Sequence, residues 1–195
     1  MAKMLDPKNV TVRADRMMKE HLNLFEKYFG EYEKEGSNYR FNVDDNAIVE
    51  IYYSEASKLL TKTFSTTVKI IVKNVEMRLS WKAKLQLRGL IKVDKILLKE
   101  LDANSVDAVA KLNSNKVFMG NMFSLFKNFD LHSVSFEYKQ AEGQMNIIIT
   151  PYPGSFIWVK LPPIYYDVRL RPEEIKKMHD MAIMFSEFFT KDKVL

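Results

Sequence analysis

The amino-acid sequence predicts an α+β fold in which two or three helices cover one face of a long, curved, antiparallel β-sheet. Helical and strand patterns occur in separate groups along the chain, which is typical of α+β proteins with antiparallel sheets. A strict alternation of apolar and polar residues from 75 to 88 indicates a long strand with one buried face. Five of the six prolines fall between 151 and 172. Because proline interrupts helices and central strands, the stretch between Pro7 and Pro151 can hold long elements.

The length of 195 residues suits a single globular domain, 1–195, because one hydrophobic core serves up to roughly 250 residues. The order of helix, strands, helix, strands and helix leaves open a weak two-half organisation with a boundary near 100–105. Hydrophobic residues make up 47% of the chain and charged residues 28%. This balance is that of a folded protein and excludes an intrinsically disordered chain.

Three segments have apolar residues at the spacing of an amphipathic helix: 11–29, 106–129 and 172–189. Gly30 is a C-terminal stop for the first helix, and Pro172 suits the first position of the last one. The middle segment weakens around 113–115, where polar residues are expected to interrupt the helix.

The other periodic segments indicate strands, and turn residues separate most of them. Residues 31–38 are expected to form a polar loop before the first strand, whereas 90–101 fits either a strand or a helix. The predicted strands are 39–43, 47–53, 68–72, 75–88, 133–139, 145–150, 156–161 and 164–170.

Segment 75–88 carries the clearest pattern, because its odd positions are apolar and its even positions are polar. A helix would scatter this period of two around its whole circumference. The parity changes at Lys73-Asn74, which marks either a two-residue hairpin turn or a bulge. A continuous strand of this length is expected to bend, and Gly89 is a candidate bulge site.

No motif in the chain indicates catalysis, a cofactor or a metal site. Glycine-rich phosphate loops and nucleophile elbows are missing, and the lack of cysteine excludes disulfides, thiolate metal sites and thiol catalysis. His21, His132 and His179 stand alone, without the spacing of metal ligands. We therefore expect no cofactor and no catalytic residues, although an enzyme whose site is dispersed over distant strands stays open.

Positive charge is concentrated in residues 58–99. Eleven lysines and arginines face two acidic residues there, a net charge of +9, so the overall +5 leaves −4 for the rest of the chain. The basic side chains expected on one face of the long strand are Arg78, Lys82, Lys84 and Arg88. Such a stripe can bind nucleic acid or an anionic membrane surface, or it can be a solvated face that keeps the strand from pairing with other molecules. Nucleic acid is the less favoured partner, because no aromatic residues alternate with these cations.

Methionine and phenylalanine are abundant, with 11 and 13 residues. Their stripes on the middle and last helices are wider than one contact with a sheet requires. Methionine is common at adaptable binding surfaces, although an ordinary core explains the same pattern. The residues proposed for an apolar ligand or a partner surface are Phe118, Met119, Met122, Phe123, Phe126, Met181 and Phe185.

These patterns favour a non-catalytic binding protein, for an apolar or amphipathic ligand such as a small molecule or lipid, or for a protein partner. Electrostatic binding through the basic segment 58–99 is the alternative. The third hypothesis is a structural or assembly subunit, for example one that forms a homo-oligomer. The sequence has no apolar run of signal-peptide length at its start and none that could span a bilayer as a helix. We expect a soluble, cytoplasmic protein.

Overall fold

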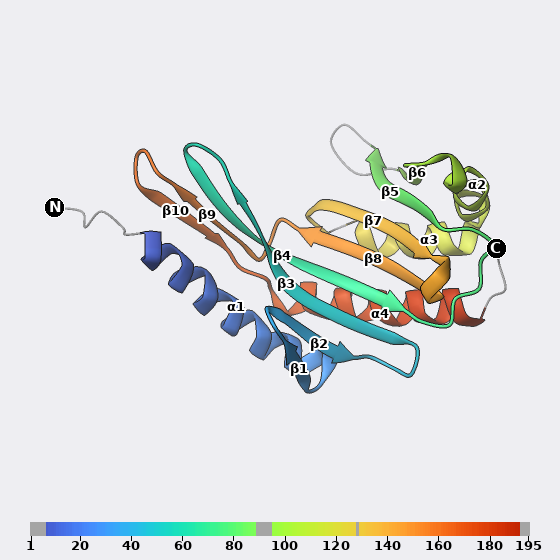
Figure 1. Ribbon diagram of the computed structural model, residues 1–195, viewed down its shortest axis with the longest axis horizontal. Helices are drawn as coiled ribbons and strands as arrows, with labels where there is room; N and C mark the ends of the chain where they lie inside the picture. The colour runs from blue at the N-terminus through green and yellow to red at the C-terminus, as the bar shows by residue number, and fades with distance from the viewer. Residues whose placement is uncertain (1–6, 89–94, 128, 192–195) are drawn as a thin grey trace.

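The computed structural model describes residues 7–88, 95–127 and 129–191, and its α+β fold confirms the predicted class (Figure 1). Within the described residues, ten antiparallel strands form one open sheet and four α-helices pack against it. The helices are α1 Pro7–Phe29, α2 Val106–Ser114, α3 Lys116–Phe126 and α4 Pro172–Lys191. The strands are β1 Tyr32–Glu35, β2 Asn38–Asn42, β3 Ala47–Ser57, β4 Thr61–Val72, β5 Trp81–Arg88, β6 Lys95–Glu100, β7 Leu131–Lys139, β8 Gln144–Pro151, β9 Ser155–Val159 and β10 Ile164–Val168.

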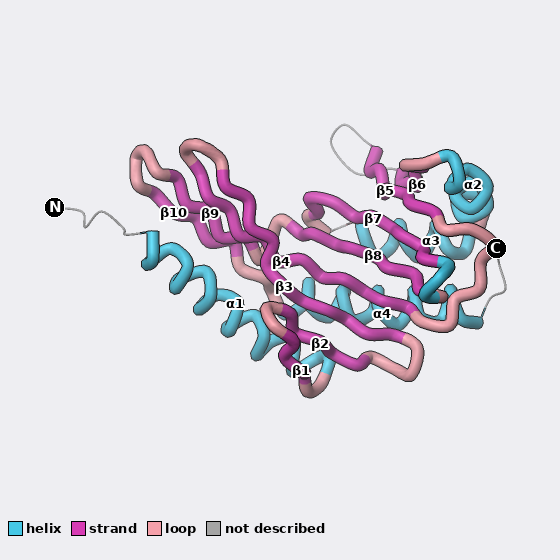
Figure 2. Tube along the Cα trace, in the orientation of Figure 1, coloured by secondary structure: helices cyan, strands magenta, loops and turns pink. Residues whose placement is uncertain are grey.

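The sheet divides into two parts along β4. The main part has the strand order β1-β2-β3-β4-β8-β7-β5-β6. The second half of β4 pairs with β8, from Val68 to Val72, whereas its first half pairs with β9, from Thr61 to Ser65. The outer halves of β3 and β4, together with β9 and β10, therefore leave the main sheet as a projecting arm, residues 54–65 and 155–168 (Figures 1 and 2).

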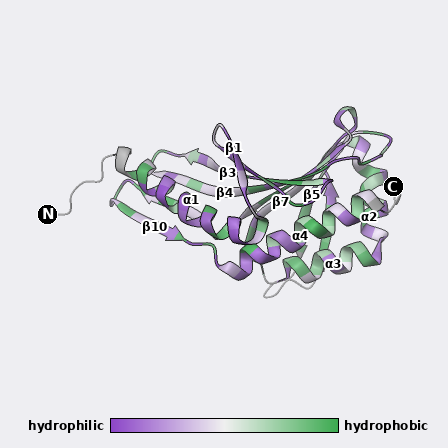
Figure 3. Ribbon diagram, turned by 90° about the horizontal axis from the view of Figure 1, so that it is seen from below, coloured by the Kyte–Doolittle hydropathy of each residue, from purple (hydrophilic) through white to green (hydrophobic). Residues whose placement is uncertain are grey.

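All the helices lie on one side of the main sheet, which leaves the opposite side open (Figure 3). Successive strand residues point to opposite faces, and the apolar ones face the helices. In β4, for example, Val68, Ile70 and Val72 are fully buried while Lys69 lies on the open face. This covered face and helices α1, α3 and α4 enclose the main hydrophobic core.

A second, smaller core lies between the arm and the first half of α1. The second half of the same helix joins the main core through Leu22, Phe25 and Phe29. The buried residues of the second core are Val10, Ala14, Met17, Phe64, Phe156 and Trp158. One long helix thus connects the arm to the rest of the molecule.

The prediction for 75–88 is corrected in its first half. Only Trp81–Arg88 form a strand, and 75–80 are a loop. Lys73-Asn74 is neither a hairpin turn nor a bulge, because β8 and β7 lie between β4 and β5 in the sheet. Asn74 adopts a positive φ of 58° and directs the chain away from β4.

Two further segments differ from the sequence-based prediction. The expected loop 31–38 contains β1, whose edge pairs with β2 in the register Tyr32↔Phe41 to Glu35↔Asn38. In the ambiguous segment 90–101, Lys95–Glu100 form strand β6. Residues 90–94 and the candidate bulge at Gly89 lie outside the described residues. The helix interruption at 113–115 is confirmed, because the Asn115 side chain caps α3 by accepting a hydrogen bond from the Phe118 amide.

Candidate functional site

The methionine and phenylalanine residues proposed as a binding surface lie in or against the main core. Phe118, Met122, Phe126, Met181 and Phe185 have at most 1% of their surface exposed. The other two, Met119 and Phe123, are half-buried against the same core. The Phe118 ring stacks on Phe188 of α4 with a centroid separation of 4.3 Å. The five buried residues therefore stabilise the interior and do not form a surface that a partner can touch.

The predicted basic stripe is shorter than expected, because Arg78 lies in the loop before β5. Lys82 and Lys84 are exposed on the open face of β5, and Arg88 is the last residue of that strand. Lys82 is paired with Glu137 of β7 at 2.8 Å. Only part of the stripe thus remains as uncompensated positive charge.

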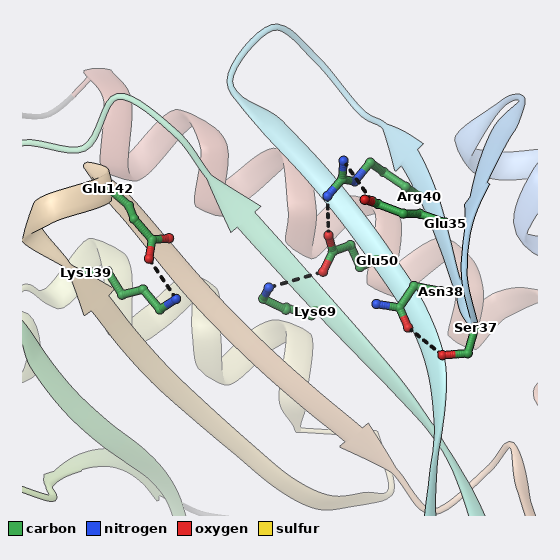
Figure 4. A network of polar contacts seen from close by, with 8 residues as sticks. All are labelled: Glu35, Ser37, Asn38, Arg40, Glu50, Lys69, Lys139 and Glu142. Carbon is green, nitrogen blue, oxygen red and sulfur yellow. Dashed lines mark hydrogen bonds and ion pairs between the residues drawn. The ribbon is translucent and has the colours of Figure 1, made fainter.

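A partly buried ion network lies on the open face of the main sheet (Figure 4). The carboxylate of Glu50 accepts hydrogen bonds from Arg40 Nη2 at 2.7 Å and from Lys69 Nζ at 3.2 Å. Glu50 is 8% exposed, and burial alone would raise its pKa, but the hydrogen bonds from Arg40 and Lys69 lower the pKa below its ordinary value. Each oxygen of this carboxylate thus contacts one cation, which favours its ionised form.

A groove of about 570 Å³ lies between α2 and the loop that enters β5. Its volume falls in the range of roughly 300–1,000 Å³ that small-molecule sites occupy. The lining combines apolar side chains with charged and polar ones: Met77, Leu79, Trp81, Ala108 and Ala110, with Arg78, Asn104, Asp107 and Lys111. This groove, rather than the methionine and phenylalanine cluster, is where a helix and the sheet leave room for a small amphipathic molecule.

The arm carries the densest set of exposed apolar side chains in the described residues. Every residue of β10 is exposed, and β10 pairs with β9 alone, so its outer edge has no strand partner among the described residues. We call the following residues the arm surface: Leu59, Leu60, Leu161, Ile164, Tyr165, Tyr166 and Val168, which are between 41% and 87% exposed. Large apolar patches on folded proteins usually mark sites of interaction.

The ends of the two arm hairpins are fixed to one another. The amide of Lys160 donates a hydrogen bond to the carbonyl of Leu60 at 2.8 Å, and the amide of Lys58 donates to Thr61 at 2.8 Å. Leu59 and Leu161 project at these ends and are 87% and 75% exposed. Two turns that are 100 residues apart in the sequence therefore form one continuous tip (Figure 1).

Lysines surround these leucines. The tip segments 58–62 and 159–163 contain Lys58, Lys62 and Lys160 and no acidic residue. Lys62 pairs with Glu55 at 2.9 Å, whereas Lys58 and Lys160 are exposed and form no ion pair with any described residue. The tip is thus both apolar and positively charged.

Little in the local sequence pattern indicated this surface. Leu59-Leu60 and Leu161 to Val168 have the composition of ordinary strand and turn residues, and their exposure depends on which strands the helices leave uncovered. The available signal was local: two leucines between Lys58 and Lys62, and a second apolar turn after Lys160.

The described residues contain no group of three or more His, Asp or Glu side chains placed to hold a metal ion. His21 is 2% exposed and accepts a hydrogen bond at Nε2 from the Leu170 amide at 3.2 Å. Burial, and to a smaller degree the charge of Arg169, lowers the pKa of His21 to about 4. A neutral imidazole bound in this way holds α1 against the start of α4.

Among the described helices none is long and apolar enough to cross a bilayer.

Comparison with known proteins gives a family but no activity. No curated protein and no solved structure matches the chain. A family model described as a protein of unknown function, DUF3156, matches residues 24–189. This match covers the end of α1, the whole sheet and nearly all of α4. The chain therefore belongs to the DUF3156 family.

Proposed function

We propose that this protein is a non-catalytic binding protein whose binding surface is the arm surface. The observation that carries this proposal is the clustering of exposed apolar residues on one projecting part of the molecule. Of the sixteen large hydrophobic residues that are exposed in the described part of the chain, seven belong to the arm surface. Exposed single apolar residues are normal, but seven on one arm of the sheet are a concentration of the kind that usually marks a site of interaction.

The rest of the molecule supports binding rather than catalysis. The buried carboxylate of Glu50 is held by two cations, and His21 is neutral and covered. Neither group is free to move a proton to or from a substrate. The arm, by contrast, presents hydrocarbon, two tyrosine rings and lysines at the end of a rigid double hairpin.

Site-directed photocrosslinking tests this proposal. Because the chain has no cysteine, Leu60→Cys introduces a single site for a benzophenone label, and Ile183→Cys on α4 provides a matched exposed control. We expect the labelled arm, but not labelled α4, to form an adduct in a whole extract of the source cells, membranes included. Excess unlabelled wild type should compete for that adduct, and unlabelled Leu161→Ser should compete poorly. Equal labelling from both positions contradicts the proposal.

A second candidate function follows from the groove between α2 and β5, whose size and mixed lining fit an apolar or amphipathic small molecule. A native mass spectrum of freshly purified protein should then show a bound mass. The Ala108→Trp substitution places an indole in the groove and should remove that mass. A wild-type spectrum at the mass of the bare chain contradicts this function and leaves the arm proposal untouched.

A further inference from the structure

We propose that the arm binds the surface of an anionic phospholipid bilayer, and that Leu59, Leu60 and Leu161 enter the interfacial layer of the lipid. This inference rests on the proposed function and names the partner of the arm surface. It depends on three features of the tip: its shape, the order of its side chains and the state of its backbone.

The shape of the tip favours a bilayer over a protein. The two hairpin ends lie together at one end of the molecule, the end where α1 also begins (Figures 1 and 2). Leu59 and Leu161 are the most exposed large hydrophobic residues of the described chain. A protein partner would need a matching pocket for such projecting side chains, whereas a fluid lipid layer adapts to them.

The side chains follow the order of a membrane interface. Leucines lie at the outermost position, and Lys58 and Lys160 adjoin them in the sequence, with Lys62 at the base of the first turn. Lysines extend their charged ends toward anionic headgroups while their stems lie along apolar material. Lysine is depleted at protein–protein interfaces, so this composition favours lipid.

Tyrosines follow the leucines along the arm. Tyr165 and Tyr166 are 45% and 54% exposed. They follow Leu161 in the sequence by four and five residues. Tyrosine is enriched at the level of lipid headgroups, because its ring is apolar and its hydroxyl remains hydrated. Tyr165 is held by the Arg13 guanidinium at 4.3 Å from its ring centroid, which fixes this residue toward α1 and leaves Tyr166 on the other face of β10.

The backbone of the tip is suited to a partly dehydrated layer. Lys58 and Thr61 exchange backbone hydrogen bonds of 2.8 and 3.4 Å across the first turn, and the Lys160 amide is bound to Leu60. Unpaired peptide groups would be costly to place near hydrocarbon. The hydrogen bonds within the first turn and the one from the Lys160 amide to the Leu60 carbonyl therefore lower the cost of bringing both turns to the lipid together.

Vesicle co-sedimentation tests the inference. The probes are vesicles of phosphatidylcholine alone and vesicles of equimolar phosphatidylserine and phosphatidylcholine. We expect binding to the anionic vesicles, weakening as salt rises, and weak binding to the neutral ones. The double variant Leu59→Ser/Leu161→Ser should lose about tenfold in partitioning for each leucine, and Lys58→Gln/Lys160→Gln about fivefold for each lysine. Val117→Ser on α3 and Lys176→Gln on α4, exposed residues outside the arm, are matched controls that should bind as wild type does.

A fluorescent label reports the position of the tip directly. An environment-sensitive dye on Leu161→Cys should brighten and shift to the blue with anionic vesicles, whereas the same dye on Val117→Cys, on α3, should not. Absence of binding by folded protein, or equal responses at the two positions, overturns the bilayer proposal. If the Leu60 photolabel instead marks a protein, or a second copy of this chain, and vesicles stay unbound, the arm remains the binding surface but its partner is not lipid.

Discussion

The phenol of Tyr138 donates a hydrogen bond to the carbonyl of Val75 at 3.0 Å, which fixes the loop before β5 to strand β7. The amide of Met77 donates in turn to the same phenol oxygen at 3.2 Å. Tyr138 is 2% exposed, so these groups have no ready access to water. This pair of contacts explains why residues 75–80 form a loop although segment 75–88 has the periodicity of a strand.

Removing the phenol oxygen should therefore loosen this loop. We expect Tyr138→Phe to lower the free energy of unfolding by about 1–3 kcal/mol, because two backbone groups lose a buried partner. Urea unfolding followed by circular dichroism measures the change. Tyr152→Phe, at a residue 56% exposed, is the control and should unfold like the wild type. A Tyr138→Phe protein as stable as that control would show that water replaces the phenol at no cost.

Local patterns predicted the helices and most strands because the period of apolar residues shows which side chains face the core. The pattern of 81–85 also held, since Trp81, Ala83 and Leu85 are buried while Lys82 and Lys84 are exposed, but Leu87, at the next apolar position, is 38% exposed. The pattern of 75–80 failed because the partners of that loop, on β7 and at Gly143, lie more than sixty residues away. Long-range contacts of this kind leave no trace in local periodicity.

The binding surface could not be predicted for a related reason. The wide apolar stripe of α3 suggested a ligand surface, but α3 packs against both β6 and α4, and two contacts need a wider stripe than one. Phe118 and Met122 of this stripe are buried in these contacts. The leucines of the arm look in sequence like those of any core, and only the three-dimensional arrangement shows that no described element covers them.

The turn between β8 and β9 should tolerate no side chain at Gly154. Its φ is +84°, and an added Cβ would lie 2.7 Å from Thr66 Oγ1 and 3.1 Å from Leu170 Cδ1. Its carbonyl also accepts hydrogen bonds from the amide and the hydroxyl of Thr66. This turn is the point where the arm leaves the main sheet, so a shift there displaces both.

We expect Gly154→Ala to cost about 2–4 kcal/mol of unfolding free energy, because backbone strain and steric overlap add. Gly36→Ala is the matched control, since Gly36 also has a positive φ, +62°, but an added Cβ would meet nothing within 4 Å. That variant should cost about 1 kcal/mol. Equal losses in urea unfolding would mean that the overlap at Gly154 is relieved by movement of Thr66.

Glu50 should account for part of the acid sensitivity of the fold. Its hydrogen bonds to Arg40 and Lys69 lower its folded-state pKa below the ordinary 4.5. The stabilisation is therefore complete above pH 4.5 and is lost as the pH falls through the lowered pKa. At neutral pH, Glu50→Gln should cost about 1–3 kcal/mol, because it removes the counter-charge of Lys69 and leaves Arg40 paired only with the exposed Glu35.

The same variant should also flatten the pH dependence of stability below pH 4.5. Urea unfolding between pH 3 and pH 7 measures both effects. Glu142→Gln is the control, because the Glu142 and Lys139 side chains are 48% and 41% exposed and their ion pair is open to solvent. A Glu50→Gln protein that keeps the full acid-induced loss of stability would assign that loss to other carboxylates.

His21 should act in a separate and higher pH window. Burial first, and Arg169 second, lower its pKa from 6.5 to about 4. Between these values the unfolded chain binds a proton that the folded protein does not, so stability is complete above pH 6.5 and declines as the pH falls toward 4. The full decline amounts to about 3 kcal/mol. His21→Gln keeps an acceptor for the Leu170 amide but cannot be protonated, so its stability should stay flat over this range. His132→Gln, at an exposed histidine, should retain the wild-type slope, and a slope shared by all three proteins would place the responsible proton elsewhere.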